Sequence, residues 1–276
     1  MTAGLDLQTL RRIAARRRGL PAYGHLLDRI AEHLDAVDGF VAWSGGKDST
    51  VVVDLARQVD PHIPIAFYDS GLQFPETLRY IDDLAGRWRL NLHVIAADPD
   101  LLTILIAGGG FDHKAPDRQL VGALGEEIIA RSAAEAHRRF GRGSLWGVRA
   151  EESPGRRHLY RRSLAAETRA QPHLRRAEIR AAAGGLVRRA DGTITYGPIW
   201  DWQRFHVFEY LAGRDIEPNP LYAKLAALGA PEHAIRVDSI IDASKLSNGH
   251  IGWLQKGWPS LYDALENALP RLGEWT

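Results

Sequence analysis

The chain contains no cysteine in its 276 residues. This absence excludes disulfides, thiolate zinc sites, cysteine-held iron–sulfur clusters and cysteine nucleophiles within the chain. The sequence has no apolar run near the ~18–20 residues that a membrane span requires, and its N-terminal arginines are not followed by the apolar stretch of a signal peptide. We therefore expect a cytoplasmic protein with no membrane partner and no iron–sulfur cluster.

An excess of one charge is also lacking, because the formal net charge is +1. Composition alone therefore does not require a nucleic-acid partner. The arginines are nevertheless unevenly placed, with five between Arg11 and Arg18 and ten between Arg156 and Arg189. These two segments are either solvated surfaces or contacts to a nucleic acid or a partner protein, and the partner could be a second copy in a homodimer.

One short stretch combines an apolar strand pattern with a glycine turn and a lysine. Residues 40–43 are apolar or aromatic, as in a buried parallel strand. The next six, Ser44-Gly45-Gly46-Lys47-Asp48-Ser49, predict a tight turn and the first turn of a helix. Glycine permits the backbone to approach a ligand closely, and a helix N-terminus with a lysine attracts anions. We therefore predict a phosphate-binding loop; the alternative is a plain strand-to-helix turn.

The rest of the chain alternates between strand and helix patterns, which predicts an α/β fold. We expect an open, mainly parallel five-stranded sheet with helices on both faces, followed by a mainly helical C-terminal extension. The segment 149–195 shows little periodic apolar pattern and predicts an arginine-rich insertion that ends in a hairpin with an Asp-Gly turn. The predicted strands are 40–43, 63–68, 92–96, 144–148 and 196–200. The predicted domains are N-terminal helices at 1–37, a nucleotide-binding domain at 38–202 and the extension at 203–276.

Polar clusters follow several of the predicted strands, where ligands bind in an open parallel sheet. Asp69-Ser70-Gly71 follows the second strand and is either part of a site or a helix-entry turn. Gly147, Arg149 and Arg156 follow the fourth strand. A guanidinium suits phosphate or sulfate, whereas the alternative is a surface Arg–Glu network worth at most ~1 kcal/mol per pair. Asp48 and Asp69 are the predicted Mg²⁺ ligands, because Mg²⁺ takes one or two carboxylates beside phosphate oxygens and water.

Taken in order, these motifs resemble the phosphoadenylyl-sulfate (PAPS) reductase family of the PP-loop, or adenine nucleotide alpha hydrolase, superfamily. The resemblance covers about residues 38–225, and Ser70 stands where the family usually has threonine. It implies that the residues of the loop hold phosphates, that Asp69 and Gly71 line the ribose or metal side, and that Arg149 and Arg156 face the second substrate or leaving group. Ser70 and Gly147 complete the predicted nucleotide site. The motifs are Ser44–Ser49, Asp69–Thr77, Gly147–Ser153, Pro198–Trp202 and Asn219–Tyr222.

The chain departs from the family in the residue that carries reduction. The resemblance implies a cysteine near the C-terminus that attacks sulfate, but this chain has none, and serine is a far weaker nucleophile at neutral pH. We therefore predict an ATP pyrophosphatase or adenylyltransferase that uses ATP and Mg²⁺ to adenylylate an unknown acceptor. Its catalytic residues would be Lys47, Asp48 and Arg149.

Two alternatives stay open. The first is a reductase-like protein that binds PAPS or adenylyl sulfate without a thiol of its own. The second is an ATP-dependent component of DNA or tRNA sulfur modification, with the arginine-rich segments on the nucleic-acid backbone.

Overall fold

The structure is a computed structural model, and it describes residues 23–109 and 124–275 apart from 232–233, 238–239, 242–244 and 247–248. The arginines predicted at 11–18 lie outside the described residues. The chain divides into two compact units. The first unit comprises residues 1–67, 85–93 and 135–218, and the second comprises 68–84, 94–134 and 219–276. The domain boundaries drawn from the sequence stay predictions.

The sheet has six strands in the order β3-β2-β1-β4-β6-β5. β1 pairs in parallel with β2 and with β4, β4 pairs in parallel with β6, and β5 is an antiparallel edge strand. The predicted α/β fold with a mainly parallel sheet is confirmed, with one strand more than expected. The strands are β1 (Gly39–Ala42), β2 (Pro64–Asp69), β3 (Asn91–Ala96), β4 (Gly143–Trp146), β5 (Leu186–Arg188) and β6 (Ile194–Tyr196).

The extra strand comes from the predicted hairpin, whose two arms are β5 and β6 around the Asp191-Gly192 turn. The strand predicted over 196–200 is wrong, because β6 ends at Tyr196 and residues 198–201 form a turn. Pro198 has no N–H to donate to a strand ladder, which ends the pairing at this point. The strand that enters the parallel sheet is therefore the second arm of the hairpin itself.

α3 (Lys47–Val59) is the central helix of the first unit, and residues 48–56 are all buried. It packs against β1, β4, α2 (Gly24–Ala36) and α9 (Arg204–Gly213). Because α3 is packed against strands and helices around its buried residues, its N-terminus has a fixed position relative to the sheet. That N-terminus follows the predicted phosphate-binding loop.

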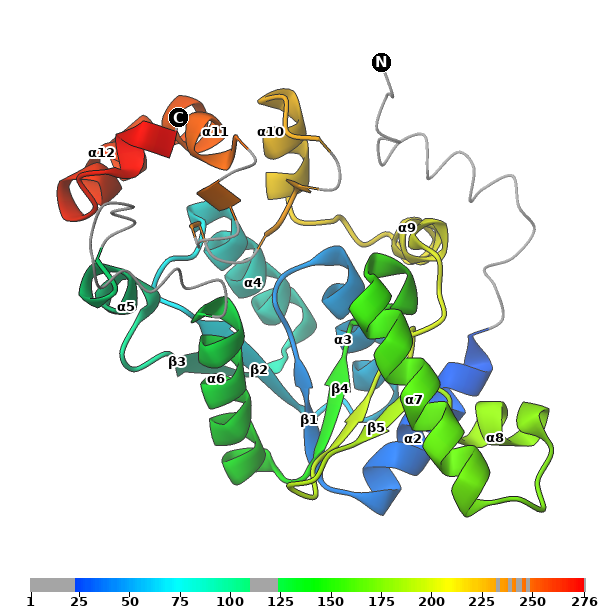
Figure 1. Ribbon diagram of the computed structural model, residues 1–276. Coiled ribbons are helices and arrows are strands. Elements are labelled where there is room, and N and C mark those ends of the chain that lie inside the picture. Colours follow the sequence, from blue (N-terminus) through cyan, green and yellow to red (C-terminus); the bar gives the residue numbers. More distant parts are fainter. Residues whose placement is uncertain are drawn as a thin grey trace. The chain divides into compact units, whose positions relative to one another are not determined.

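Two helices of the first unit were not predicted from the sequence. They are α7 (Pro154–Ala170) and α8 (Arg176–Ala183), which contact each other, and α7 also packs on β5. α7 lies in front of the sheet in Figure 1. Ser153 caps α7 by accepting the Arg156 N–H at 3.1 Å, and Pro154 occupies the first helical turn. The arginine-rich segment is therefore mostly helical.

The second unit contains a separate hydrophobic core, in which Leu72 and Phe74 pack with buried leucines and isoleucines from its helices. Its helices include α5 (Leu101–Ala107), α10 (Leu221–Ala227), α11 (His250–Gly257), α12 (Pro259–Ala268) and a terminal 3-10 turn (Leu272–Trp275). Two helices, α4 (Pro75–Trp88) and α6 (Leu124–Phe140), contribute residues to both units. In the part of the chain described, no helix is long and apolar enough to cross a membrane.

Candidate functional site

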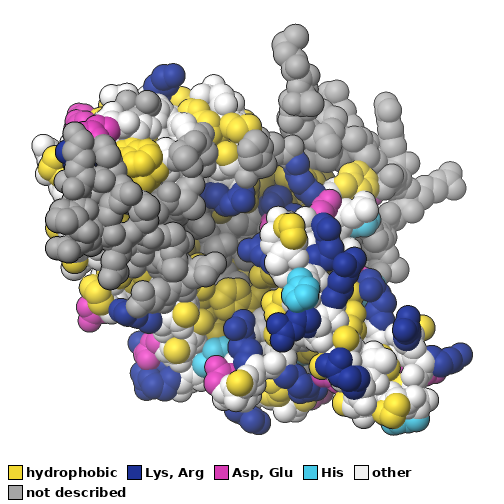
Figure 2. Space-filling view, viewed as in Figure 1, with side chains coloured by type: hydrophobic (Ala, Val, Ile, Leu, Met, Phe, Trp, Pro, Cys, Tyr) yellow, Lys and Arg dark blue, Asp and Glu magenta, His cyan; other side chains and the backbone are white. Residues whose placement is uncertain are grey.

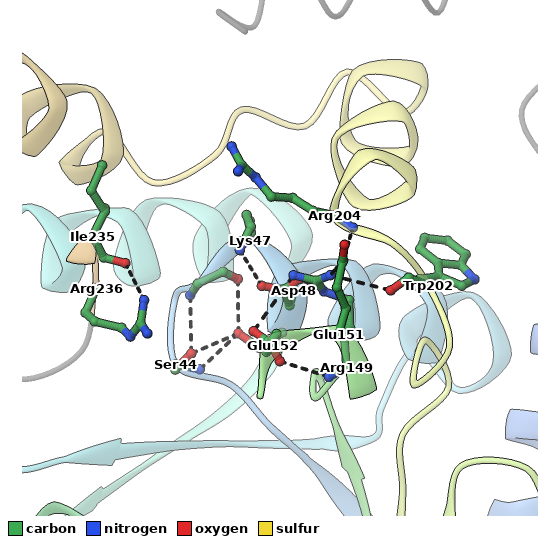
Figure 3. Close-up of polar contacts among 12 residues, drawn as sticks. Ser44, Lys47, Asp48, Arg149, Glu151, Glu152, Trp202, Arg204, Ile235 and Arg236 are labelled. Atoms are coloured by element: carbon green, nitrogen blue, oxygen red, sulfur yellow. Dashed lines mark hydrogen bonds and ion pairs between the residues drawn. The ribbon is translucent and has the colours of Figure 1, made fainter. Parts of the chain in front are cut away.

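Residues 44–49, which lead from β1 into the first turn of α3, form a tight loop that Ser44 and Ser49 close. Gly45 has a φ of +71°, a backbone conformation that glycine adopts without strain. The Ser49 hydroxyl donates to the Gly46 carbonyl at 3.0 Å and accepts from the Ser44 N–H at 3.3 Å. The hydroxyls of Ser44 and Ser49 lie 3.1 Å apart (Figure 3). The six predicted residues thus form one hydrogen-bonded loop at the positive end of the α3 dipole.

Asp48 links the loop to two cations. Its Oδ2 accepts from Lys47 Nζ at 2.7 Å, and its Oδ1 accepts from Arg149 Nε at 2.6 Å (Figure 3). The side chains of Lys47 and Asp48 are largely buried, and that of Arg149 is only 4% exposed. Charges removed from water in this way interact strongly, so the three side chains form one electrostatic unit.

Arg149 is held on every side by acceptors. Its NH1 group donates to Glu151 Oε2 at 2.6 Å and to the Trp202 carbonyl at 3.4 Å. Its backbone N–H donates to Glu152 Oε2 at 2.9 Å. Burial by itself lowers the pKa of the guanidinium, but Asp48, Glu152 and Glu151 outweigh burial and raise that pKa above its usual value. Arg149 is therefore a permanent cation beside the loop.

Arg156 has different surroundings. Its side chain is 44% exposed on α7 and forms an ion pair with Glu152. The sequence left open that these arginines belong to a surface Arg–Glu network. The exposed Arg156 does, whereas Arg149 is buried. The roles predicted for both arginines toward a second substrate stay predictions.

Gly147 lies against the start of α3. A Cβ atom built on it would come within 2.3 Å of the Ser49 nitrogen and 2.5 Å of the Asp48 carbonyl carbon. No side chain fits in that space without moving the backbone of the loop. Gly147 is therefore the residue that lets the segment after β4 approach the first turn of α3.

Asp69, Ser70 and Gly71 belong to the second unit. The Asp69 carboxylate accepts the Gly71 N–H at 2.8 Å, and Gly71 has a φ of +80°. Ser70 Oγ accepts from the Leu72 N–H at 3.3 Å. The segment is a turn that leads from β2 toward α4, which agrees with the alternative of a helix-entry turn. Its predicted contact with a nucleotide stays a prediction.

Glu151 and Glu152 were not predicted as site residues from the sequence. The structure places both on Arg149, and the Glu151 carboxylate also accepts the Arg204 N–H at 2.6 Å, at the start of α9 (Figure 3). Their position two and three residues after a predicted phosphate-binding arginine was the available signal. These carboxylates act as counter-charges to Arg149 and fix the orientation of its guanidinium.

Asp48 and Asp69 are the residues predicted to bind Mg²⁺. Within the described ranges, no group of three or more His, Cys, Asp or Glu side chains could hold a metal. Both Asp48 oxygens are already in ion pairs. A magnesium ion at Asp48 would compete with Lys47 and Arg149 for these oxygens. The assignment of Asp48 and Asp69 as its ligands stays a prediction.

A glycine turn with a lysine, set between a buried parallel strand and a buried helix, defines a nucleotide-binding α/β protein. Residues 39–230 match the model of the phosphoadenosine phosphosulfate reductase domain. The chain belongs to this family, as its motifs predicted, and the Ser44–Ser49 loop is its PP-loop.

The relatives and one solved structure that we compared carry names of the same family. A phosphoadenosine 5'-phosphosulfate reductase from Thiocapsa roseopersicina is 31% identical over 224 residues, which cover 78% of this chain and 79% of that protein. One from Alteromonas mediterranea is 45% identical over 58 residues, which cover 21% of this chain and only 23% of that relative. The phosphoadenylyl-sulfate reductase from Candida auris, solved as a phosphate complex, has a TM-score of 0.48 at 13% identity over 87% of this chain and 96% of that one.

Proposed function

We propose that this chain binds ATP at its PP-loop and cleaves it between the α and β phosphates, transferring the adenylyl group to an acceptor. The observation that carries the proposal is an intact PP-loop in a chain of the reductase family that contains no cysteine. Without a thiol the chain cannot itself form the S-sulfo intermediate of a reductase, so the nucleotide chemistry of the superfamily is what its residues can still perform.

The charges around the loop support this proposal. The α3 N-terminus and Lys47 would bind the phosphates, and the Lys47 ammonium would exchange its contact with Asp48 for a phosphate oxygen. Arg149 is already fixed by Asp48 and Glu151, so it needs no reorganisation when charge develops near it. Preorganised cations of this kind stabilise a transition state more than they stabilise a ground state.

In the proposed step, an oxygen of the acceptor attacks the α-phosphorus of ATP. A bond forms between that oxygen and the phosphorus, and the bond from the phosphorus to the bridging oxygen of the β-phosphate breaks. The electron pair leaves with pyrophosphate, and the acceptor proton passes to solvent. Lys47 and Arg149 stabilise the negative charge, and the magnesium ion of the substrate shields the phosphates.

Pyrophosphate release tests the proposal. The chain is incubated with Mg·ATP and a panel of candidate acceptors, and wild type is compared with Lys47→Ala. We expect release that depends on the acceptor and falls by at least about 100-fold in the variant, the size typical of losing one electrostatic contact. Lys256→Ala is the matched control, because Lys256 is exposed and belongs to the second unit. Tight ATP binding without pyrophosphate from any acceptor would contradict the proposal.

A second candidate function is the binding of a sulfonucleotide by a reductase-like protein whose thiol comes from elsewhere. Membership of the family and the name of the Thiocapsa relative favour it. Calorimetry separates the two candidates. A preference for phosphoadenylyl sulfate over ATP of more than about tenfold, or ~1.4 kcal/mol, would favour the second, and a preference for ATP would favour the first.

A further inference from the structure

The two unpredicted helices carry a dense group of arginines. We call the exposed arginines of α7, α8 and the residue before α8 the α7–α8 basic surface. The same segment contains two glutamates, and both are already paired, Glu167 with Arg188 and Glu178 with Arg175. A chain with a net charge of +1 thus concentrates positive charge on one surface. The arginines are Arg156, Arg157, Arg161, Arg162, Arg169, Arg175, Arg176 and Arg180.

Five of these arginines have no carboxylate partner within the described part of the chain. Arg156, Arg175 and Arg180 form ion pairs with Glu152, Glu178 and Asp201. Among the residues that the structure describes, the other five, which are all exposed, have no ion pair or hydrogen bond from their side chains. They are Arg157, Arg161, Arg162, Arg169 and Arg176. On α6, by contrast, the exposed Arg138 and Arg139 share Glu135.

Four of the five unpaired arginines lie on α7, in two rows along the helix, and the fifth, Arg176, begins α8. Tyr160 is the buried residue of this helix, and it packs against Trp200. Arg157 and Arg161 are four residues apart, and Arg162 and Arg169 are seven apart, so the members of each pair lie on the same side of the helix. From Arg157 to Arg169 the array extends about 18 Å, at ~1.5 Å per residue. Figure 2 shows Lys and Arg side chains gathered over α7 and α8, at the right of the view.

We propose that the α7–α8 basic surface binds the phosphate backbone of a nucleic-acid duplex without reading its sequence. Like charges held close together without counter-charges repel one another, and a row of phosphates relieves that repulsion along its whole length. Guanidinium groups match phosphate in geometry as well as in charge. This inference stands on the charge array alone and does not depend on the proposed adenylyl transfer.

The surface fits a duplex better than the other polyanions. A single strand is bound by stacking its bases on aromatic rings, but the tyrosine of α7 is buried and α8 has no aromatic residue. An acidic protein would be expected to bind around an apolar or aromatic centre. Leu159 is the one exposed large hydrophobic side chain on these two helices. The ligand proposed for the α7–α8 basic surface is therefore a regular, extended polyanion such as a duplex.

Fluorescence anisotropy of the full chain with a labelled duplex tests this inference across a salt series. The variant removes three charges from the array, Arg161→Gln with Arg162→Gln and Arg169→Gln. The matched control removes three exposed arginines from other helices of the first unit, Arg87→Gln with Arg138→Gln and Arg139→Gln. Circular dichroism establishes that both variants are folded.

For wild type we expect the logarithm of the association constant to fall linearly with the logarithm of the salt concentration. The array variant should lose about 2.7 from that slope, ~0.9 per phosphate contact, and at about 0.1 M salt it should bind on the order of 100-fold more weakly. The control should keep the wild-type slope.

Three results would overturn the inference. The first is no duplex binding by wild type at about 50 mM salt. The second is an equal loss in the array variant and the control, because that would reflect net charge alone. The third is tighter binding to a single strand or to polyglutamate than to the duplex.

Discussion

Arg149 is the side chain that joins the PP-loop to the segment after β4. It reaches Asp48 at 2.6 Å across 101 residues of sequence, and Glu151 at 2.6 Å from its own segment. Because the guanidinium is planar and fixed on several sides, it holds the Asp48 carboxylate in one orientation. A ligand at the loop therefore meets an Asp48–Arg149 pair that is already in place.

Replacing Arg149 with alanine should destabilise the folded chain. The side chains of Asp48 and Arg149 are nearly excluded from water, and removing one partner of a buried ion pair costs about 3–5 kcal/mol. Urea unfolding measures the change in free energy. Arg156→Ala is the matched control, since it removes the exposed partner of Glu152 and should cost less than about 1 kcal/mol. Equal losses in the two variants would contradict the assignment of Arg149 as the buried partner.

His33 on α2 is a buried imidazole that folding keeps uncharged. Its Nε2 has no hydrogen-bond partner among the described residues, and its ring lies 5.5 Å from that of Tyr196. Burial, followed by repulsion from Arg188 and Arg29, lowers the pKa of His33 from 6.5 to about 4. The unfolded chain therefore binds a proton at His33 between pH 6.5 and 4, while the folded chain does not.

From this difference we predict that stability falls as the pH is lowered from about 6.5 toward 4. The His33 contribution to the free energy of unfolding is complete above pH 6.5, and its full loss by about pH 4 corresponds to roughly 3 kcal/mol. Urea unfolding across this pH range, with wild type and His33→Leu compared, isolates the contribution. Parallel curves for the two proteins would contradict it.

At the scale of the element, the position of α3 depends on a glycine outside it. Gly147→Ala would place a Cβ 2.3 Å from the Ser49 nitrogen, so the first turn of α3 would have to move. We expect a loss of about 1–3 kcal/mol in stability from overpacking and at least a tenfold loss in nucleotide affinity. Calorimetry with ATP measures the second effect. Gly86→Ala on α4 is the control, because a methyl group added there would have nothing within 4 Å. Wild-type affinity for ATP in Gly147→Ala would contradict the role assigned to Gly147.

α3 is also fixed at its middle, by the buried carboxylate of Asp54. It accepts from Tyr210 Oη at 2.7 Å and from Arg214 Nε at 2.9 Å, near the end of α9, and it pairs with Arg57 on α3 itself. The hydrogen bond to Asp54 is the first cause that raises the pKa of Arg214, and Asp54 also adds to the effect of burial in raising the pKa of Tyr210. The Asp54 carboxylate is therefore the charged part of the contact between α3 and α9, beside the hydrogen bond from Gln58 to Tyr210.

Asp54→Asn should weaken that contact while keeping the shape of the side chain. We expect a loss of about 3 kcal/mol in unfolding free energy, because two guanidinium groups would lose their carboxylate. Asp201→Asn is the control, since its pair with Arg180 is exposed on both sides and should be worth less than about 1 kcal/mol. Urea unfolding of both variants checks the prediction, and a larger loss for Asp201→Asn would contradict it.

The elements that could be predicted are those whose signal is local. The strand, glycine turn and helix around Ser44–Ser49 are encoded in consecutive residues, and so is the Asp191-Gly192 hairpin. α7 was not predicted because Tyr160 is the one buried residue on it, so apolar residues do not recur at helical spacing along its sequence. The available signals were its Ser-Pro start and its content of arginine, leucine and alanine, which favour helix.

At the scale of the whole molecule, the contacts between distant segments could not be predicted. Nothing in the sequence near Arg149 shows that its partner is Asp48, and nothing near Gly147 shows that it faces Ser49. An aspartate such as Asp54 within an apolar helix signals a buried polar network, but not its partners on α9. Which side chains meet at the carboxyl ends of strands depends on the strand order, and the order requires the folded sheet.

The whole chain combines a reductase-family fold with a sequence that holds no thiol. We propose that its chemistry takes place at the α-phosphorus of ATP. Phosphorus-31 NMR of the products formed from Mg·ATP with an acceptor identifies the phosphorus that is attacked. We expect an adenylyl product with pyrophosphate, in wild type but not in Lys47→Ala. ADP with inorganic phosphate would show cleavage between the β and γ phosphates and would contradict it.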